Sequence, residues 1–249
     1  MNKEFYAENR GTLYESVKKN SLVIVFGGCA PKRSNDENYP FYANRNFLYL
    51  TGVEQENTVL MTAVLEDGHD EYLYILPPDA MEERWTGRRL KADEIEEISG
   101  ITKTRYTQQF MDCLWTYLRV KGIERVYLDF DKLDAKEPDT ESYRLAKYIQ
   151  REFPYIQIEN LQNQLRAQRT IKKPCEIEAL RKAEEITREG IIAMMKASKP
   201  GMYEYQYKAE FDYVLAQHGV LMTGFPSIIS AGDNNFCIHY YDYRGQAKD

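Results

Sequence analysis

The sequence has few histidines and none of the short motifs on which many catalytic sites are built. Only three of its 249 residues are histidines, which limits any mechanism that depends on imidazole groups. The patterns GxGxxG, GxxxxGKS/T, GxSxG and HExxH are all absent. No dinucleotide fingerprint, phosphate loop, serine-hydrolase elbow or zincin helix is therefore indicated.

Cysteines, long apolar runs and basic clusters are also scarce. The four cysteines lie far apart without CxxC pairs, which favours reduced thiols over a disulfide framework or a zinc-thiolate site. No run approaches the roughly 18 apolar residues of a membrane-spanning helix, and residues 1–13 are polar, unlike a signal peptide. The 39 acidic residues outnumber the 33 basic ones, which are scattered. We expect a cytoplasmic, soluble protein that binds neither nucleic acid nor membrane.

What the sequence does contain is an alternation of helical and strand patterns in its first two thirds. Apolar residues at helical spacing predict three helices, and short apolar runs predict two strands beside them. Two further β-rich runs flank Asp67-Gly68 and predict a hairpin. In chain order these elements cover residues 5–17, 21–26, 57–65, 71–76, 110–118, 125–129 and 140–152. The alternation predicts a mixed α/β domain.

The composition changes near Gln168, where a polar, glutamine-rich stretch ends, and the domain boundary is predicted there. Pro174 opens a long helix with one apolar side. The predicted elements after the boundary are helices from Pro174 to Pro200 and over 203–218, then strands over 227–231 and 236–243.

The three histidines differ in their sequence surroundings. His69 falls in the predicted hairpin turn and His218 on a last helical turn, so structural or solvent-facing roles are indicated for both. His239 is a candidate site residue because it lies at the end of an aromatic strand pattern, although a packed strand histidine is the alternative. His239 and Asp242 would point to opposite faces of a strand, so they do not form a self-contained metal site.

Trp85 is the second candidate, because it is one of only two tryptophans and stands beside Gly87, Arg88 and Arg89. Such a group offers a stacking surface next to two carboxylate-binding side chains. The alternative is a surface anchor that packing holds in place. The acidic and basic residues around it are typical of a solvated face.

Five stretches resemble one family in their order and spacing along the entire chain. They are NRNFLYLTG at 44–52, PDAMEERWTGRR at 78–89, RTIKKPCEI at 169–177 with LRKA at 180–183, KPGMYEY at 199–205, and GDNNFCIHY at 232–240. Together they are similar to aminopeptidase P, the Xaa-Pro aminopeptidase.

The resemblance implies an α/β fold in two parts. The first is a mixed-sheet domain of the creatinase/prolidase type over residues 1–168, and the second, over 169–249, is the first part of a pita-bread M24 metallopeptidase domain. Family members remove an N-terminal residue that precedes proline, using two divalent ions, usually manganese, held by two Asp, one His and two Glu. Two such ions activate a water and polarise the attacked carbonyl.

The resemblance also implies roles for the two candidates. His239 matches a catalytic histidine that is not a metal ligand but lies beside the substrate, where it assists proton handling or holds the scissile amide. Trp85 matches a substrate-binding position that oligomers bring towards a neighbouring subunit's active site, so a homo-oligomer is expected. All five metal ligands would lie beyond Asp249, so no metal is expected in this chain, and the chain alone is expected to be inactive.

A non-catalytic peptide-binding protein with a pita-bread-like domain is the alternative function. His239 argues against it, because a protein without catalytic activity has little need of a proton-handling group. The sequence downstream of Asp249 would discriminate, since five intact ligands favour the enzyme and substituted ligands favour the binding protein. Strands after residue 227 would also lack partners and expose an edge, so the part after Gln168 is expected to be mobile or paired with another chain.

Overall fold

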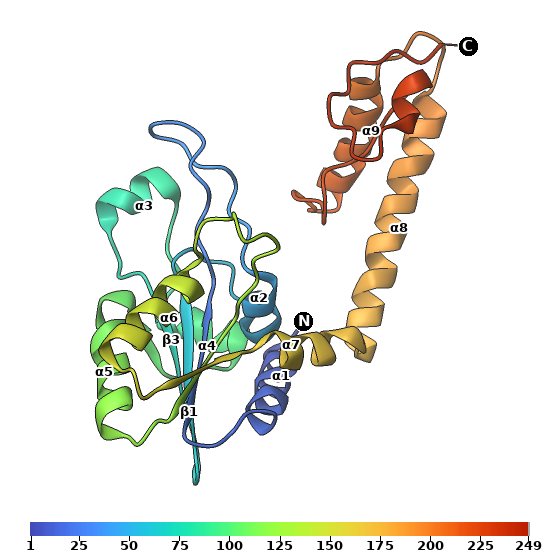
Figure 1. Ribbon diagram of the computed structural model, residues 1–249. Coiled ribbons are helices and arrows are strands. Elements are labelled where there is room, and N and C mark those ends of the chain that lie inside the picture. The colour runs from blue at the N-terminus through green and yellow to red at the C-terminus, as the bar shows by residue number, and fades with distance from the viewer. Residues whose placement is uncertain (249) are drawn as a thin grey trace. The chain divides into compact units, whose positions relative to one another are not determined.

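The computed structural model describes residues 1–248, which form two compact units, Met1–Ile171 and Lys172–Asp249 (Figure 1). The units divide three residues after Gln168. The assignment of residues 1–168 and 169–249 to two named domains remains a prediction.

The first unit is built on one six-stranded mixed sheet, with the strand order β4-β3-β2-β1-β5-β6. β1 pairs antiparallel with β2 and parallel with β5, so it lies at the centre. Nearly every side chain of β1 and β2 is buried, as expected for strands covered on both faces. The strands are β1 (Ser21–Phe26), β2 (Val59–Leu65), β3 (Gly68–Ile75), β4 (Thr104–Tyr106), β5 (Arg125–Leu128) and β6 (Gln157–Asn160). The predicted mixed α/β architecture is confirmed.

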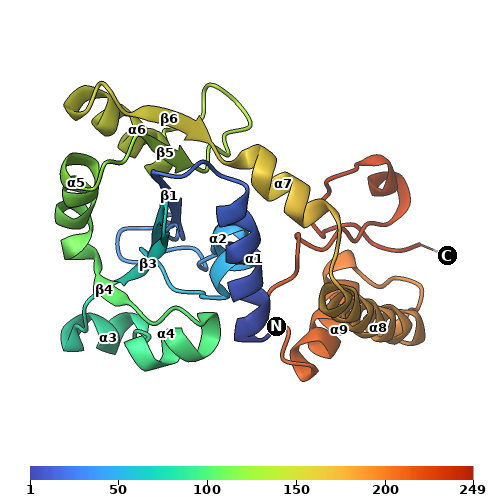
Figure 2. The same ribbon diagram turned by 90° about the horizontal axis from the view of Figure 1, so that it is seen from below.

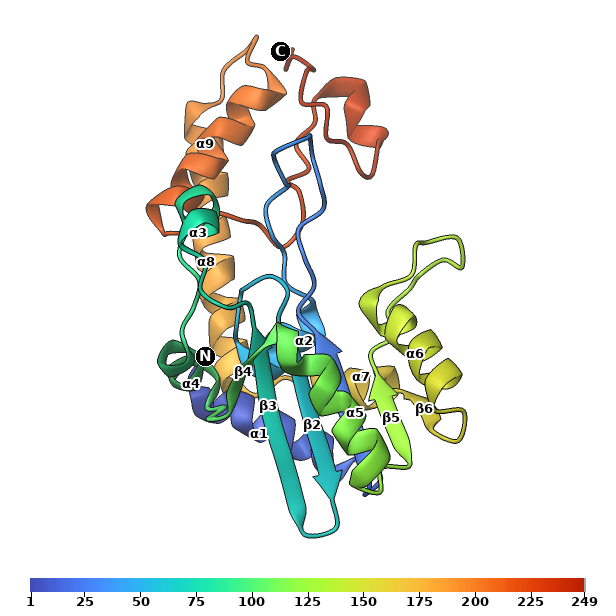
Figure 3. The same ribbon diagram turned by 90° about the vertical axis from the view of Figure 1, so that its left-hand side faces the viewer.

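The predicted hairpin is present as β2 and β3, which form the long ribbon in Figure 3. Leu65 pairs with Gly68, so the two-residue turn is Glu66-Asp67, one residue earlier than expected. Gly68 begins β3 with φ of +143°, a backbone angle that favours glycine. His69 therefore belongs to β3 and not to the turn.

Alternate residues of the central strand face two separate cores. Leu22 and Ile24 pack beneath α5 and α6, and Val23 and Val25 pack on the opposite face, which α1, α2, α4 and α7 cover (Figure 2). The helices of the unit are α1 (Lys3–Glu15), α2 (Arg45–Thr51), α3 (Ala80–Thr86), α4 (Ala92–Ser99), α5 (Phe110–Val120), α6 (Glu141–Glu152) and α7 (Gln162–Thr170). Of these, α3 has no buried residue, and α7 occupies the polar stretch in which the sequence showed only a boundary.

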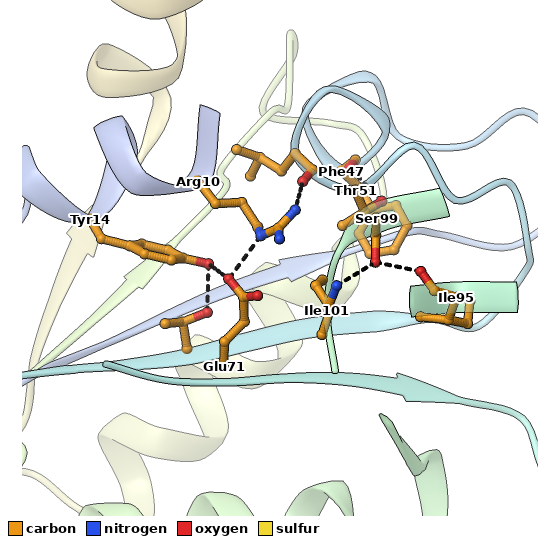
Figure 4. A network of polar contacts seen from close by, with 10 residues as sticks. Arg10, Tyr14, Phe47, Thr51, Glu71, Ile95, Ser99 and Ile101 are labelled. Carbon is orange, nitrogen blue, oxygen red and sulfur yellow. Dashed lines mark hydrogen bonds and ion pairs between the residues drawn. The ribbon is translucent and has the colours of Figure 1, made fainter. Parts of the chain in front are cut away.

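A buried ion pair joins α1 to the sheet (Figure 4). Arg10 Nε lies 2.8 Å from Glu71 Oε1 on β3, and its Nη1 donates to the Leu50 carbonyl oxygen at 2.8 Å. The Tyr14 hydroxyl donates to the same Glu71 oxygen at 2.8 Å and lies 2.7 Å from Thr62 Oγ1. Since every charged or polar group here has a partner, burial of the pair is compatible with a stable core.

The second unit begins with two packed helices, α8 (Pro174–Ala197) and α9 (Glu204–Gln217). Their contact depends on Gly190, because a Cβ there would lie 2.5 Å from the Phe211 ring. Pro174 stands at the first helical turn, where its missing N–H costs nothing. Both helices were predicted from the sequence.

The prediction of strands over 227–231 and 236–243 is wrong for the described residues. Residues 227–231 and 237–243 are irregular, and between them lies a 3₁₀ helix, η2 (Gly232–Phe236). In the described part of the second unit, the one β-type pairing is an isolated bridge between Tyr203 and Gln246. A strand needs a neighbour to pair its backbone groups, and the described part of the second unit has none to offer.

Candidate functional site

The candidate site is the segment around His239, which one buried carboxylate holds in shape. Glu204, at the first turn of α9, is fully buried. Its Oε1 accepts hydrogen bonds from the Ala231 backbone N–H at 2.6 Å and from Asn234 Nδ2 at 3.0 Å, and its Oε2 accepts one from the Gly245 N–H at 2.8 Å. One side chain thus ties together the two ends of the segment 231–245 that carries His239.

These hydrogen bonds also set the ionisation of Glu204. Burial by itself would raise its pKa, but hydrogen bonds from Asn234, Tyr240, Gly245 and Ala231 favour the carboxylate and leave the pKa below the ordinary value of 4.5. A carboxyl group whose pKa is lower in the folded than in the unfolded state stabilises the fold at pH values above its unfolded-state pKa. That contribution is lost as the pH falls towards the folded-state pKa.

Glu204→Gln should loosen this segment, because an amide offers one acceptor oxygen where the carboxylate uses two. We expect backbone hydrogen exchange over 231–246 to become about tenfold faster at pH 7, as loss of a charge-assisted hydrogen bond implies. The same segment of the unchanged chain should open more easily as the pH falls below about 4.5. Glu210→Gln on the exposed side of α9 is the matched control, and equal exchange in both variants would contradict the role of Glu204.

His239 is exposed, and its imidazole stacks on the Tyr241 ring with centroids 6.3 Å apart and planes 9° apart. Its neighbour Tyr240 is anchored, since the Tyr240 hydroxyl accepts a hydrogen bond from Asn234 Nδ2 at 3.0 Å. An exposed imidazole on a fastened backbone can give or accept a hydrogen bond from a bound molecule. The structure therefore leaves His239 accessible and does not pack it within a strand.

The described residues do not fit a metal centre. Among residues 1–248 there is no group of three or more His, Cys, Asp or Glu side chains that could hold an ion. Glu204 faces backbone and amide N–H groups, which satisfy a carboxylate without a cation. We derive no metal-dependent step for these residues.

An apolar groove of about 750 Å³ lies within the second unit, between α8, α9 and the segment that follows α9. Ile186, Ile191 and Met194 line it from α8, and Phe211 and Leu215 from α9. This groove accounts for the apolar side of α8 that the sequence showed.

Trp85 lies on α3, where its side chain is 84% exposed. The interpretation of Trp85 as an anchor held by packing is therefore wrong for this chain. Arg88 forms two hydrogen bonds of 2.6 Å with Glu94, and this contact lowers the pKa of Glu94 to about 2. Arg89 donates to the Pro77 carbonyl oxygen. Both guanidinium groups are occupied, so the indole face is what this surface presents.

The other two histidines, His69 and His218, each contact a neighbouring side chain. The His69 ring packs 5.2 Å from the Tyr14 ring, and His218 Nε2 lies 2.8 Å from Glu189 Oε2. Neither site needs a ligand to explain it.

Sequence reasoning missed two groups of polar residues. Glu204 lies within the family-like stretch at 199–205, but nothing in the sequence marked it as a residue that fastens the segment around His239. A second group surrounds the buried Asp129, which directly follows β5 and accepts hydrogen bonds from Asn46 and Gln162. An acidic residue at the carboxyl end of a buried strand could have pointed to this group, because ligands of α/β sheets bind at that edge.

Two family models match the chain in succession. Residues 6–127 match the aminopeptidase P N-terminal domain, and residues 178–249 match metallopeptidase family M24. The order of these matches, an aminopeptidase P N-terminal domain before an M24 segment, is typical of the metalloaminopeptidase class. Within that class, the chain belongs to the aminopeptidase P family.

Curated relatives and solved structures agree with this assignment. The chain is 25% identical over 238 residues to a Xaa-Pro aminopeptidase of Haemophilus influenzae, covering 96% of this chain and 53% of the relative. It is 26% identical over 254 residues to that of Escherichia coli, covering 100% and 57%. The chain therefore spans little more than half the length of these relatives.

Among solved structures, a Bacillus anthracis protein assigned as an aminopeptidase P has a TM-score of 0.95 at 31% identity, covering 100% of this chain and 59% of that one. The low-pH form of Escherichia coli aminopeptidase P has a TM-score of 0.89 at 24% identity and shows the same fold, with 57% of it covered. The expected creatinase/prolidase-type domain followed by part of a pita-bread domain is confirmed.

Proposed function

We propose that this chain supplies the N-terminal portion of a Xaa-Pro aminopeptidase. The whole protein hydrolyses the bond between an N-terminal residue and a following proline, and its substrates are peptides with proline at the second position. The observation that carries this proposal is that both family models match in order and that Xaa-Pro aminopeptidases align with nearly the entire chain.

Two divalent ions, manganese in the cell, activate water in the proposed whole enzyme. We propose that the residues that hold these ions lie in the rest of the whole enzyme, as the family resemblance implies. The chain alone is accordingly proposed to be inactive. None of the helices within residues 1–248 has the length and apolar character of a membrane span. The location that we propose for the whole enzyme is the cytoplasm.

His239 is proposed as the residue of this chain that contacts the substrate. Its exposed imidazole can hold the scissile amide by a hydrogen bond or carry a proton there. Glu204 is a positioning residue, because its hydrogen bonds to Ala231, Asn234 and Gly245 fix the segment on which His239 stands.

Trp85 is proposed to contact peptide bound to a neighbouring subunit of a homo-oligomer. An indole that is 84% exposed on a helix with no buried residue is a suitable contact surface. In the protein extended to the length of its relatives, Trp85→Ala should raise KM several-fold and leave kcat nearly unchanged. Met81→Ala, which removes another exposed side chain of α3, is the control. An unchanged KM would rule out this contact.

The proposed specificity is tested by comparing two peptides with the extended protein and added Mn²⁺. Release of alanine from Ala-Pro-Ala, with little release from Ala-Ala-Ala, is expected. Equal rates for the two peptides would identify a general aminopeptidase instead, and binding of Ala-Pro-Ala without release would favour the non-catalytic peptide-binding protein.

A further inference from the structure

A polar cleft lies in the first unit at the carboxyl ends of β1 and β5. These strands are parallel neighbours, and from them the chain continues towards opposite edges of the sheet, β1 to β2 and β5 to β6. Such a point of divergence is where open α/β sheets bind ligands. Two cavities meet there, of about 230 Å³ and 560 Å³, and both are lined by Tyr42, Asn44 and Asp131.

The smaller cavity is an acidic compartment. Asp129, Asp131 and Glu141 line it. Asp129 is almost fully buried and accepts hydrogen bonds only from uncharged amides, from Asn46 Nδ2 at 2.8 Å and from Gln162 Nε2. Burial raises the pKa of both Asp129 and Glu141, and for Glu141 it outweighs the lowering effect of Arg144.

A buried hydroxyl group in this compartment has no hydrogen-bond partner among residues 1–248. The buried Thr140 Oγ1 is unpaired, and Ser142, which is 95% buried, lines the cavity beside it. Both stand at the start of α6. Buried polar groups are nearly always satisfied, so the Thr140 hydroxyl points to a bound molecule that can donate to it.

The larger cavity is a basic compartment. Arg45, Lys132, Arg166 and Arg169 line it, against the single carboxylate of Asp131. Arg45 stacks on the Tyr42 ring with its guanidinium carbon 3.4 Å from the centroid, and its buried Nη2 has no hydrogen-bond partner in the described chain. Arg166 is exposed and makes no ion pair there. Two guanidinium groups therefore have donors left for an anion.

We propose that this cleft binds a short zwitterionic peptide, with its ammonium group in the acidic compartment and its carboxylate in the basic compartment. The two compartments adjoin through Tyr42, Asn44 and Asp131, so one molecule can reach both. The acidic groups do not converge as metal ligands do. An ammonium group suits them instead, because it needs several spread acceptors. The proposal depends on the first unit alone and not on the proposed peptidase activity.

The test is calorimetric titration of the 249-residue chain with the dipeptide Ala-Ala. One binding site per chain is expected. Asp131→Asn and Arg166→Gln should each weaken binding about tenfold, the loss that one charge-assisted hydrogen bond implies. Asp67→Asn in the β2–β3 turn and Arg151→Gln near the end of α6 are controls of the same chemistry, and they should bind as the unchanged chain does.

Capped dipeptides separate the two ends of the ligand. N-acetyl-Ala-Ala and Ala-Ala-amide should each bind at least about tenfold more weakly than Ala-Ala. The amide signals of Glu141 and Ser142 should shift in ¹⁵N spectra when Ala-Ala is added. Equal binding of the capped peptides, no binding of Ala-Ala at millimolar concentration, or acetate binding as tightly as Ala-Ala would each overturn the proposal.

Discussion

Replacing His239 by alanine in the protein extended to the length of its relatives should lower kcat/KM for Ala-Pro-Ala by about 10²- to 10⁴-fold, the range expected when a group that handles protons is lost. The physical reason is that the imidazole is exposed and Glu204 fastens its backbone, so the imidazole is available to the substrate and alanine offers no group to replace it. The measurement is steady-state release of alanine with Mn²⁺ present.

His218→Ala is the matched control. His218 follows the last residue of α9, is also accessible, and contacts Glu189 on α8. It should leave kcat/KM within about twofold of the unchanged protein, as is usual for surface substitutions. A loss of the same size in both variants would mean that His239 acts on folding and not on the substrate. Unchanged activity of His239→Ala would remove it from the mechanism.

Arg10→Met should destabilise the first unit by about 3–5 kcal/mol, because it leaves the Glu71 carboxylate buried without its cation. The side chain of Arg10 is 3% exposed and that of Glu71 is 15% exposed, so water can replace the lost partner only in part. The Tyr14 hydroxyl would remain as a donor, but it carries no charge to offset that of Glu71. The free energy of unfolding from urea titration measures this loss.

Two further variants show whether the Arg10–Glu71 ion pair is responsible for the loss of stability. Arg10→Met combined with Glu71→Leu should recover most of the stability, because no uncompensated charge is left. Arg33→Met removes one partner of an exposed pair, in which Arg33 and Glu37 are 56% and 58% exposed, and should change stability by only about 0–1 kcal/mol. An Arg10→Met variant as stable as Arg33→Met would contradict the importance of the buried pair.

The sequence predicts the first unit well because its elements are local and strongly patterned. The apolar run 21–26 becomes β1 with the predicted bounds, and the helical spacing after Phe110 becomes α5. The hairpin turn was misplaced by one residue because Gly68 can occupy either the turn or the first strand position. The buried contact of Arg10 with Glu71 joins residues 61 positions apart, which no local pattern reveals.

The second unit shows where sequence patterns are insufficient. Residues 227–231 and 236–243 have strand-like composition, but a strand exists only where another strand pairs with it. Within these stretches, the Ala231 N–H bonds to Glu204 and the Cys237 N–H to the Asn234 carbonyl oxygen instead. His239 was identified through family resemblance, whereas the role of Glu204 emerged only from three-dimensional contacts that span 27 to 41 residues.

The polar cleft was missed for a similar reason. Asn44 and Asp131 are 87 positions apart, and Asn46 and Asp129 are 83 positions apart. Each residue alone is an unremarkable polar residue in a loop or at a helix start. Only the parallel pairing of β1 with β5 brings these segments to the same edge of the sheet.

The most direct measurement compares the 249-residue chain with the protein extended to the length of its relatives, each given Ala-Pro-Ala and Mn²⁺. Release of alanine by the extended protein alone is the predicted result, because the described residues of the shorter chain contain no group that could hold the metal ions. Release at similar rates by both would contradict the account, since the catalytic metal site would then lie within these 249 residues.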